Sequence, residues 1–202
     1  ASEASSQAAD EVSEAIAARE AGEAIAACEV SEAIAAGIGL LTEDRKLQGL
    51  VLSHSVKDNF GLPNLNRFAP AGFVRTSIER REFQDYVTTM RVKISNENQK
   101  ANQLSGGNQQ KLVIAKWLAR HCEVLIFDEP TRGIDVGAKY EIYQLMNDLA
   151  AKGKAIIMIS SELPEILGMA DRILVMHEGK ITGEIEDVTS TTQEEIMHFA
   201  VA

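Results

Sequence analysis

Two short, entirely apolar runs constrain the fold of this chain more than any other sequence feature. Residues 124–127 read Val-Leu-Ile-Phe, and residues 155–159 read Ala-Ile-Ile-Met-Ile. Uninterrupted apolar runs of this length are typical of strands that a parallel sheet buries on both faces. A helix is predicted between them, because apolar residues recur at helical spacing from 142 to 149 and Asp135 can cap its start. The alternation of strand and helix predicts an α/β layer architecture.

Flanking segments extend this pattern in both directions. Apolar runs, capping residues and turn signals predict several further elements. They are, in chain order, a strand at 38–42, a mostly helical and loop-rich insert at 47–103, a helix at 109–120, a short helix begun by Pro164, a hairpin of strands 172–177 and 181–185, and a terminal helix with a capping box at 192–195.

Length and composition bound the class of protein. At 202 residues and 45% hydrophobic, the chain can bury one substantial core, and we expect one domain with an appendage. The longest apolar runs are far shorter than the roughly 20 residues that span a bilayer, and no basic-then-apolar leader opens the chain. The two cysteines and four histidines show no disulfide or ligand spacing, which favours a reduced cytosolic compartment.

The negative charge is concentrated at the start of the chain. Eight acids and one base in residues 1–36 carry −7 of the formal charge of −10, which leaves −3 for residues 37–202. A nucleic-acid surface normally carries a basic stripe, and the loose basic stretch from Arg67 to Arg81 does not form one. We therefore expect no nucleic acid among the partners.

Residues 1–36 are rich in alanine and nearly repetitive. The sequence Glu-Ala-Ile-Ala-Ala recurs at an interval of nine residues, from Glu14, Glu23 and Glu32. Alanine and glutamate favour helix, but nine residues at about 100° each place successive isoleucines on opposite faces, so no continuous apolar stripe results. We interpret the segment as a cloning scar or a replacement of native sequence; the alternative is a partner-binding helix.

Residues 104–110, Leu-Ser-Gly-Gly-Asn-Gln-Gln, form the first candidate site. The glycines remove side chains where backbone must approach a ligand, and the Ser105 hydroxyl can donate a hydrogen bond. The start of the following helix offers unpaired N–H groups to an anion. This combination suits a phosphate, although a Ser-Gly-Gly triplet alone is also typical of an ordinary loop.

Asp128 and Glu129 form the second candidate site, at the carboxyl end of the apolar run 124–127. Open α/β sheets bind their ligands at that edge. Asp128 suits Mg²⁺, held through water, because this ion prefers hard oxygen ligands and keeps several waters. Glu129 would polarise the water that attacks a terminal phosphate. Two solvated turn acids are the alternative interpretation.

Four segments, in this order, closely resemble those of ATP-binding cassette ATPases, and the match extends over residues 37–202. The segments are residues 104–110, 128–131, 133–135 and 159–162. The closer resemblance is to the second cassette of the bacterial monosaccharide importers, the ribose, xylose, arabinose and galactose group. It rests on residues 42–46, 108–110, 130–137 and 159–165, and it does not indicate which sugar is transported.

The resemblance implies a role for each matching residue, because these ATPases close as a head-to-tail pair around ATP. Asp128 would support Mg²⁺ and Glu129 would orient the hydrolytic water. A set of residues would lie against the ATP of a second cassette, fused or in trans, or at the seam of the pair. These are Ser105, Gly106, Gly107, Asn108, Gln109 and Asp135.

Two candidate catalytic positions depart from the family pattern. Glu43 stands where most of the family has a glutamine that senses the γ-phosphate, and Ser161 stands where most has a histidine. A serine cannot supply an imidazole contact, and a glutamate near a phosphate adds like charge unless magnesium intervenes. The resemblance therefore implies a site that hydrolyses ATP slowly or not at all.

A larger departure is the phosphate loop, since the 202 residues contain no Gly-x-x-x-x-Gly-Lys-Ser/Thr sequence. Without its lysine and N–H donors, ATP binding in cis should be weak. We expect a P-loop NTPase core of parallel sheet and flanking helices, truncated at the N-terminus, in which 37–202 is a partial nucleotide-binding domain. Its helical subdomain would span about 47–121, and 122–202 would hold the remaining motifs and the C-terminal strands.

The function implied by the resemblance is that of an ATPase subunit fragment of a monosaccharide importer. Its partners would be membrane permease subunits and, indirectly, a periplasmic sugar-binding protein, at the cytoplasmic face of the bacterial cell membrane. The isolated chain should be inactive or very weak. The alternative is a degenerate cassette that completes a partner's ATP site. Four apolar residues of the insert would either contact the permease or form a satellite core: Leu50, Val51, Phe60 and Leu62.

Overall fold

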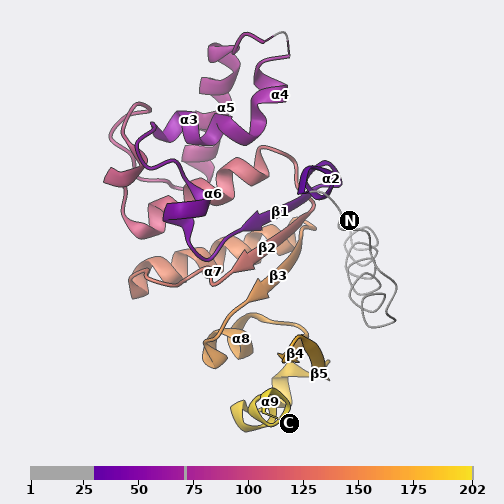
Figure 1. The fold of residues 1–202 in the computed structure, drawn as a ribbon. Helices are drawn as coiled ribbons and strands as arrows, with labels where there is room; N and C mark the ends of the chain where they lie inside the picture. Colours follow the sequence, from indigo (N-terminus) through magenta and orange to yellow (C-terminus); the bar gives the residue numbers. More distant parts are fainter. Residues whose placement is uncertain (1–29, 71, 202) are drawn as a thin grey trace.

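The centre of the computed structural model, which describes residues 30–70 and 72–201, is a parallel sheet of three strands (Figure 1). The strands, in spatial order, are β1 (Ile38–Leu41), β2 (Val124–Asp128) and β3 (Ala155–Ile159). Val124 pairs with Ile38 on one side and with Ala155 on the other. All three predicted parallel strands are confirmed.

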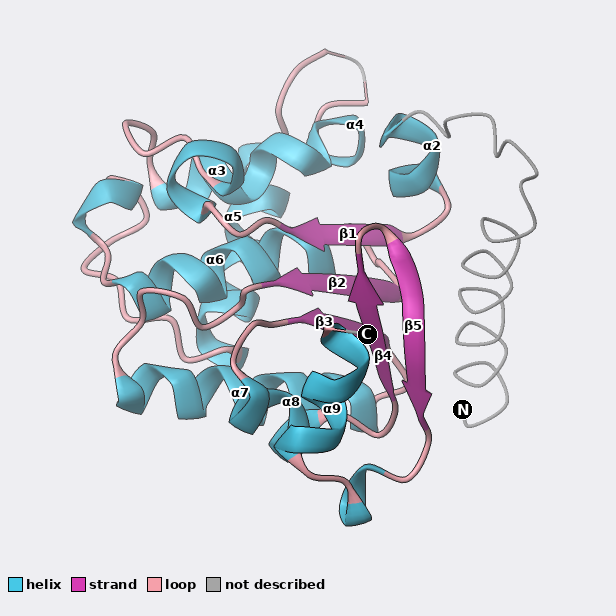
Figure 2. Cartoon of the chain, turned by 60° about the horizontal axis from the view of Figure 1, so that its bottom comes forward, coloured by secondary structure: helices cyan, strands magenta, loops and turns pink. Residues whose placement is uncertain are grey.

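Two long helices lie side by side against one face of this sheet (Figure 2). They are α6 (Gly106–Leu118), which contacts β1, and α7 (Val136–Ala151), which contacts β3. Each begins at a capping side chain: Ser105 accepts from the amide of Asn108, and Asp135 accepts from the amide of Ala138. The predicted cap at Asp135 and the predicted apolar face of α7 are confirmed.

The insert between β1 and α6 is helical, as predicted, and forms the upper part of the molecule in Figure 1. A π-helix leads into it and short 3-10 turns connect its parts. The elements are η1 (Arg45–Gly49), α3 (Val56–Gly61), η2 (Leu62–Asn64), α4 (Leu65–Phe68), α5 (Thr76–Thr89) and η3 (Ala101–Gln103).

An aromatic cluster organises the core of this insert. The Phe60 ring lies 5.5 Å from the rings of Phe83 and Tyr86, and 6.1 Å from that of Phe68, between centroids. Phe60 and Leu50 are buried, whereas Val51 and Leu62 are each 41% exposed. Of the two interpretations of these four residues, core packing is therefore correct for Leu50 and Phe60.

The C-terminal part forms a second, antiparallel sheet of two strands, which with the helix after it packs around its own small apolar cluster. Its predicted hairpin turns at Glu178 and Gly179, both with positive φ. The predicted capping box at Thr192 is also confirmed. The elements are α8 (Leu163–Met169), β4 (Ile173–His177), β5 (Lys180–Ile185), η4 (Val188–Ser190) and α9 (Gln193–Ala200).

The prediction that residues 155–159 form a fully buried strand is wrong. Its first four residues are half-buried, and Ile159 is 50% exposed. Among the described residues β3 pairs only with β2, so it is an edge strand, and α6 and α7 cover one face of the sheet. An apolar run signals a strand that can be buried, but the burial itself depends on neighbouring elements.

Only the end of the alanine-rich segment falls within the described residues, where α2 (Val30–Ala35) precedes β1. The interpretation of residues 1–29 lies outside them. Within residues 30–70 and 72–201, no helix is long and apolar enough to cross a membrane. Cys122 is a free, buried thiol.

Candidate functional site

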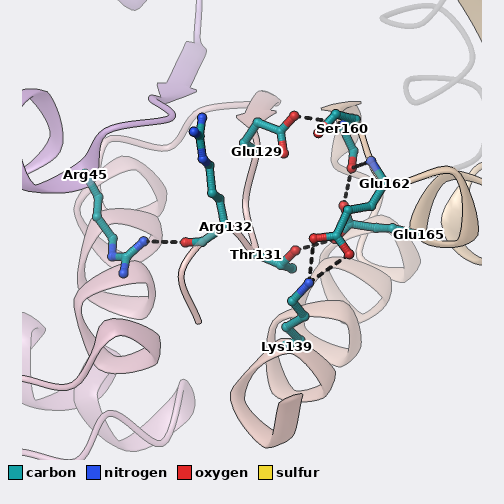
Figure 3. Close-up of polar contacts among 9 residues, drawn as sticks. Arg45, Glu129, Thr131, Arg132, Lys139, Ser160, Glu162 and Glu165 are labelled. Carbon is teal, nitrogen blue, oxygen red and sulfur yellow. Dashed lines mark hydrogen bonds and ion pairs between the residues drawn. The ribbon is translucent and has the colours of Figure 1, made fainter. Parts of the chain in front are cut away.

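The carboxyl ends of β2 and β3 bring Glu129 and Ser161 together. The Glu129 amide donates to the Ile159 carbonyl oxygen at 2.9 Å, which continues the pairing of the two strands by one residue. The Ser161 amide then donates to Glu129 Oε1 at 2.8 Å (Figure 3). Glu129 has a φ of 45°, a left-handed conformation that non-glycine residues rarely adopt. Backbone from two strands thus fixes both the main chain and the carboxylate of this residue.

Asp128 ends β2 and stands directly before Glu129 with its side chain half-buried. No group of three or more His, Cys, Asp or Glu side chains in the described part of the chain could by itself hold a metal ion. The Asp128 carboxylate offers hard oxygen atoms, which suit an ion that keeps most of its waters, as Mg²⁺ does. The assignment of Asp128 to Mg²⁺, through water, stays a prediction.

A buried carboxylate, Glu165, links the segments that follow β2 and β3. Thr131 Oγ1 donates to Glu165 Oε1 at 2.8 Å, and the Ser160 hydroxyl donates to Glu165 Oε2. Thr131 is 1% exposed and Glu165 6% exposed. Burial and a hydrogen bond to Glu165 raise the pKa of the neighbouring Tyr143 phenol. These contacts join residues 34 and 5 positions apart, and no sequence signal pointed to them.

An exposed ion pair lies on the solvent side of the residues that are bonded to Glu165. Lys139 Nζ lies 2.7 Å from Glu162 Oε1 and also bonds the second oxygen (Figure 3). This hydrogen bond raises the pKa of Lys139. The pair joins the start of α7 to the residue before α8, and at such exposure it contributes little to stability.

The start of α6 presents Ser105 and Asn108 at the surface. Ser105 is exposed, and its hydroxyl oxygen accepts from Asn108 Nδ2 at 2.9 Å. Asn108 Oδ1 in turn accepts from the Lys93 amide at 2.8 Å. The helix start is therefore accessible at Ser105, while the Asn108 amide is bonded to the Ser105 hydroxyl oxygen.

Gly106 and Gly107 have close neighbours within the molecule. A Cβ at Gly106 would lie 2.7 Å from Arg45 Nη2 and 3.3 Å from the Gly133 carbonyl oxygen. A Cβ at Gly107 would lie 2.7 Å from Ala138 Cβ on α7. The two glycines are thus required for packing against residues 133 and 138, in addition to any ligand that their backbone contacts.

The structure does not bring Gln109 to the same surface. Its side chain is 4% exposed, and Nε2 donates to the Ala101 carbonyl oxygen at 3.0 Å. Position 109 falls on the inner side of α6, whereas Ser105 and Asn108 lie on its outer side. The contact of Gln109 is therefore with the insert in this conformation.

Arg45 is a site residue that sequence reasoning missed. Its guanidinium donates to the carbonyl oxygen of Arg132 at 2.9 Å (Figure 3). It also donates to that of Gly133 at 3.3 Å, and it is only 8% exposed. Burial lowers its pKa. The same side chain packs under Gly106, so η1, the turn after β2 and the start of α6 meet at one residue. The charged cluster at 43–46 was the only sequence signal.

The remaining predicted positions lie around this junction. Glu43 forms an ion pair with Arg132, and Asp135 is an exposed helix cap. Asp128, Glu129 and Ser161 thus share one sheet edge. Ser105, Gly106 and Asn108 form a separate surface at the start of α6.

The arrangement is that of an ATP-binding cassette. The ATP-binding cassette MJ1267 superimposes with a TM-score of 0.68 at 20% identity, covering 83% of this chain and 70% of that one. The dimeric cassette MJ0796, in a post-hydrolysis state bound to ADP and Pi, gives 0.61 at 23% identity and covers 73% and 62%. At these identities the likeness concerns the fold alone.

Residues 9–132, more than half of the chain, match the ABC transporter family, and the chain belongs to that family. The match includes residues 9–36 of the alanine-rich segment. Among curated relatives, the ribose import ATP-binding proteins RbsA of Oceanobacillus iheyensis and Lactococcus lactis subsp. cremoris are 53% and 55% identical over 165 residues. That of Bacillus subtilis is 53% identical over 164 residues. These alignments cover 81–82% of this chain, which spans about one third (33%) of the length of each relative.

Proposed function

We propose that this chain is a nucleotide-binding part of the ATPase subunit of a monosaccharide importer. The observation that carries the proposal is the position of Glu129, whose carboxylate is held by the Ser161 amide beside Asp128 at the carboxyl edge of the sheet. The identity of more than half to proteins named for ribose import supports the substrate class.

The proposed chemistry is hydrolysis of the terminal phosphate of ATP. Glu129 Oε1 is occupied by the Ser161 amide, so Oε2 is the oxygen that would accept a proton from the attacking water. Asp128 would hold Mg²⁺ through water, and that ion would neutralise charge on the phosphates. Glu43 and Ser161 would stand near the same phosphate, as the family pattern implies.

A second cassette would complete the site. Ser105 and Asn108 lie on an exposed helix start, where they would face ATP held by that second copy, with Gly106, Gly107 and Asp135 at the seam. The further partners are permease subunits and, through them, a sugar-binding protein outside the membrane. The subunit would then act at the cytoplasmic face of the bacterial cell membrane.

The turnover test uses the full-length subunit assembled with its permease. Glu129→Gln removes the proton acceptor while keeping the shape of the side chain and its contact with the Ser161 amide. We expect the ATPase kcat to fall about 10²- to 10⁴-fold, with the KM for ATP little changed. Glu162→Gln is the matched control, because that carboxylate is exposed and bonds Lys139 rather than Glu129. Loss of turnover in the control alone would contradict the assignment of Glu129.

A degenerate cassette is the second candidate, and specific observations favour it. Glu43 forms an ion pair with Arg132, and Ser161 offers no imidazole where most of the family has a histidine. In that case Glu129→Gln would leave turnover unchanged, whereas Ser105→Arg would abolish it by filling the space for a partner's phosphate. We also propose that the isolated chain binds ATP weakly; micromolar affinity in a titration with Mg²⁺ would contradict this.

A further inference from the structure

Glu165 is a buried carboxylate whose hydrogen bonds come from neutral donors, while the Lys139 ammonium acts on it only through its charge. It is 6% exposed, and none of the ion pairs within the described residues involves it. Its two oxygens instead accept from the hydroxyls of Thr131 and Ser160. Burying a charge against neutral donors costs stability. What the carboxylate provides at this position is a pair of hydrogen bonds to hydroxyl groups of two different segments.

The two hydroxyl groups flank Glu129 in the structure. Thr131 follows Glu129 by two positions on the segment after β2, and Ser160 directly precedes the amide that bonds Glu129 Oε1. The Ser160 hydroxyl oxygen also accepts from the Glu162 amide at 3.1 Å. In Figure 3 these contacts and Arg45 lie on opposite sides of the segment after β2. The Ser160 hydroxyl group thus bonds two groups that follow Ser161 in the chain, the Glu162 amide and the Glu165 carboxylate.

We propose that Glu165 is a positioning residue, which clamps Thr131 to Ser160 and thereby holds the Ser161 amide against Glu129. The proposal rests on the proposed function of Glu129. Without the clamp, the hydrogen bonds between the segments after β2 and β3 that involve Glu129 would be its backbone bond to Ile159 and its contact with the Ser161 amide. Ser161 would then be free to move, and the Glu129 carboxylate would lose the contact that selects its orientation.

The neighbouring groups are consistent with a purpose beyond packing. Tyr143 on α7 contributes a hydrogen bond to the same carboxylate. The clamp therefore joins the segments after β2 and β3 to α8 and α7, and these contacts would change if α7 or α8 moved. A displacement of about 1 Å at a reacting group can cost about 100-fold in rate.

One test is the turnover of the full-length assembly. Glu165→Ala should lower the ATPase kcat about 10- to 100-fold with the KM for ATP within about twofold. Thr131→Val, which removes one hydroxyl without changing shape, should lower kcat in the same direction, and Thr131→Ser should restore it. Glu162→Ala is the control, since its side chain reaches only Lys139. An unchanged kcat in both Glu165→Ala and Thr131→Val would overturn the proposal.

A double-mutant comparison separates positioning from a merely structural effect. In a Glu129→Gln background, Glu165→Ala should lower kcat further by less than twofold, because the residue acts through the carboxylate already removed. An equal fall of kcat in both backgrounds would overturn the proposal, because Glu165→Ala would then act by disturbing the fold. If Glu129→Gln itself turned over normally, the proposed function would fail.

A measurement on the Ser161 amide distinguishes that outcome from failure of the clamp. In this chain labelled with ¹⁵N, the Ser161 amide, which donates to Glu129 Oε1, should exchange slowly with solvent. This protection should be lost in Glu165→Ala and Thr131→Val and kept in Thr131→Ser and Glu162→Ala. A Ser161 amide that remains protected in Glu165→Ala would overturn the clamp, whatever the role of Glu129.

Discussion

The molecule contains two apolar clusters that differ in size and in how completely their side chains are buried. The larger joins β1, β2, α6, α7 and the helical insert, and it holds the fully buried rings of Phe60, Phe68 and Phe127. The smaller, in the C-terminal hairpin and α9, consists of residues 3–8% exposed: Ile173, Val175, Val188 and Ile196. The strand β3 is only half-buried, and its Ile156 and Met158 pack against the larger cluster. Burial in this chain therefore depends on which elements cover a strand, and not on the apolar content of the strand alone.

The largest expected effect is in the larger cluster. Phe60→Ala should lower the free energy of unfolding by about 3–5 kcal/mol, because Phe60 is fully buried among three aromatic rings. Urea denaturation measures the change. Phe73→Ala is the matched control, since Phe73 is 84% exposed, and it should stay within about 0.5 kcal/mol. Equal losses of unfolding free energy in both variants would contradict the burial of Phe60 in the core of the insert.

The larger cluster also borders a buried amine, which predicts a dependence on pH. Lys116 donates to the Gly49 carbonyl oxygen, and burial lowers its pKa from 10.5 to about 8. Between these values the unfolded chain binds the proton and the folded chain does not, so stability rises with pH across that window. Relative to Lys116→Met, the chain should gain as much as about 3 kcal/mol between pH 8 and 10.5. Parallel stability curves for the two proteins would contradict the lowered pKa.

The smaller cluster should respond locally. Ile196→Ala should weaken the packing of α9 on the hairpin by about 2 kcal/mol. Hydrogen exchange should then show faster exchange of amides in β4 and β5, with those in β2 unchanged. Met197→Ala, at a position 45% exposed, is the control. Equal acceleration in β2 would show that the two clusters unfold as one unit.

Much of the fold could be predicted from local signals. The apolar run at 124–127, the Asp135 cap and the Thr192 capping box each depend on residues close in sequence, and each is confirmed. Burial of β3 could not be predicted, because it depends on what pairs with its second edge. The assignment of Leu50 and Phe60 to the core likewise needed the position of α5 and α6.

The residues of the candidate site likewise divide into those that local sequence signals indicate and those that they do not. Asp128, Glu129 and Ser105 were found because sheet edges and helix starts have local signatures. Arg45 and Glu165 were not, since their partners lie 87 and 34 positions away. A charge cluster or a helix acid in sequence does not reveal which distant carbonyl or hydroxyl it will meet.

The left-handed backbone of Glu129, with φ of 45°, means that the carboxylate proposed to act on water stands where a side chain is unfavourable for folding. A side chain in this conformation costs about 1–3 kcal/mol, and glycine would relieve it while removing the carboxylate. Glutamine keeps the same backbone cost as glutamate, so a comparison of those two isolates the charge. The acid after β2 is thus retained where the chain would fold more readily with no side chain at all.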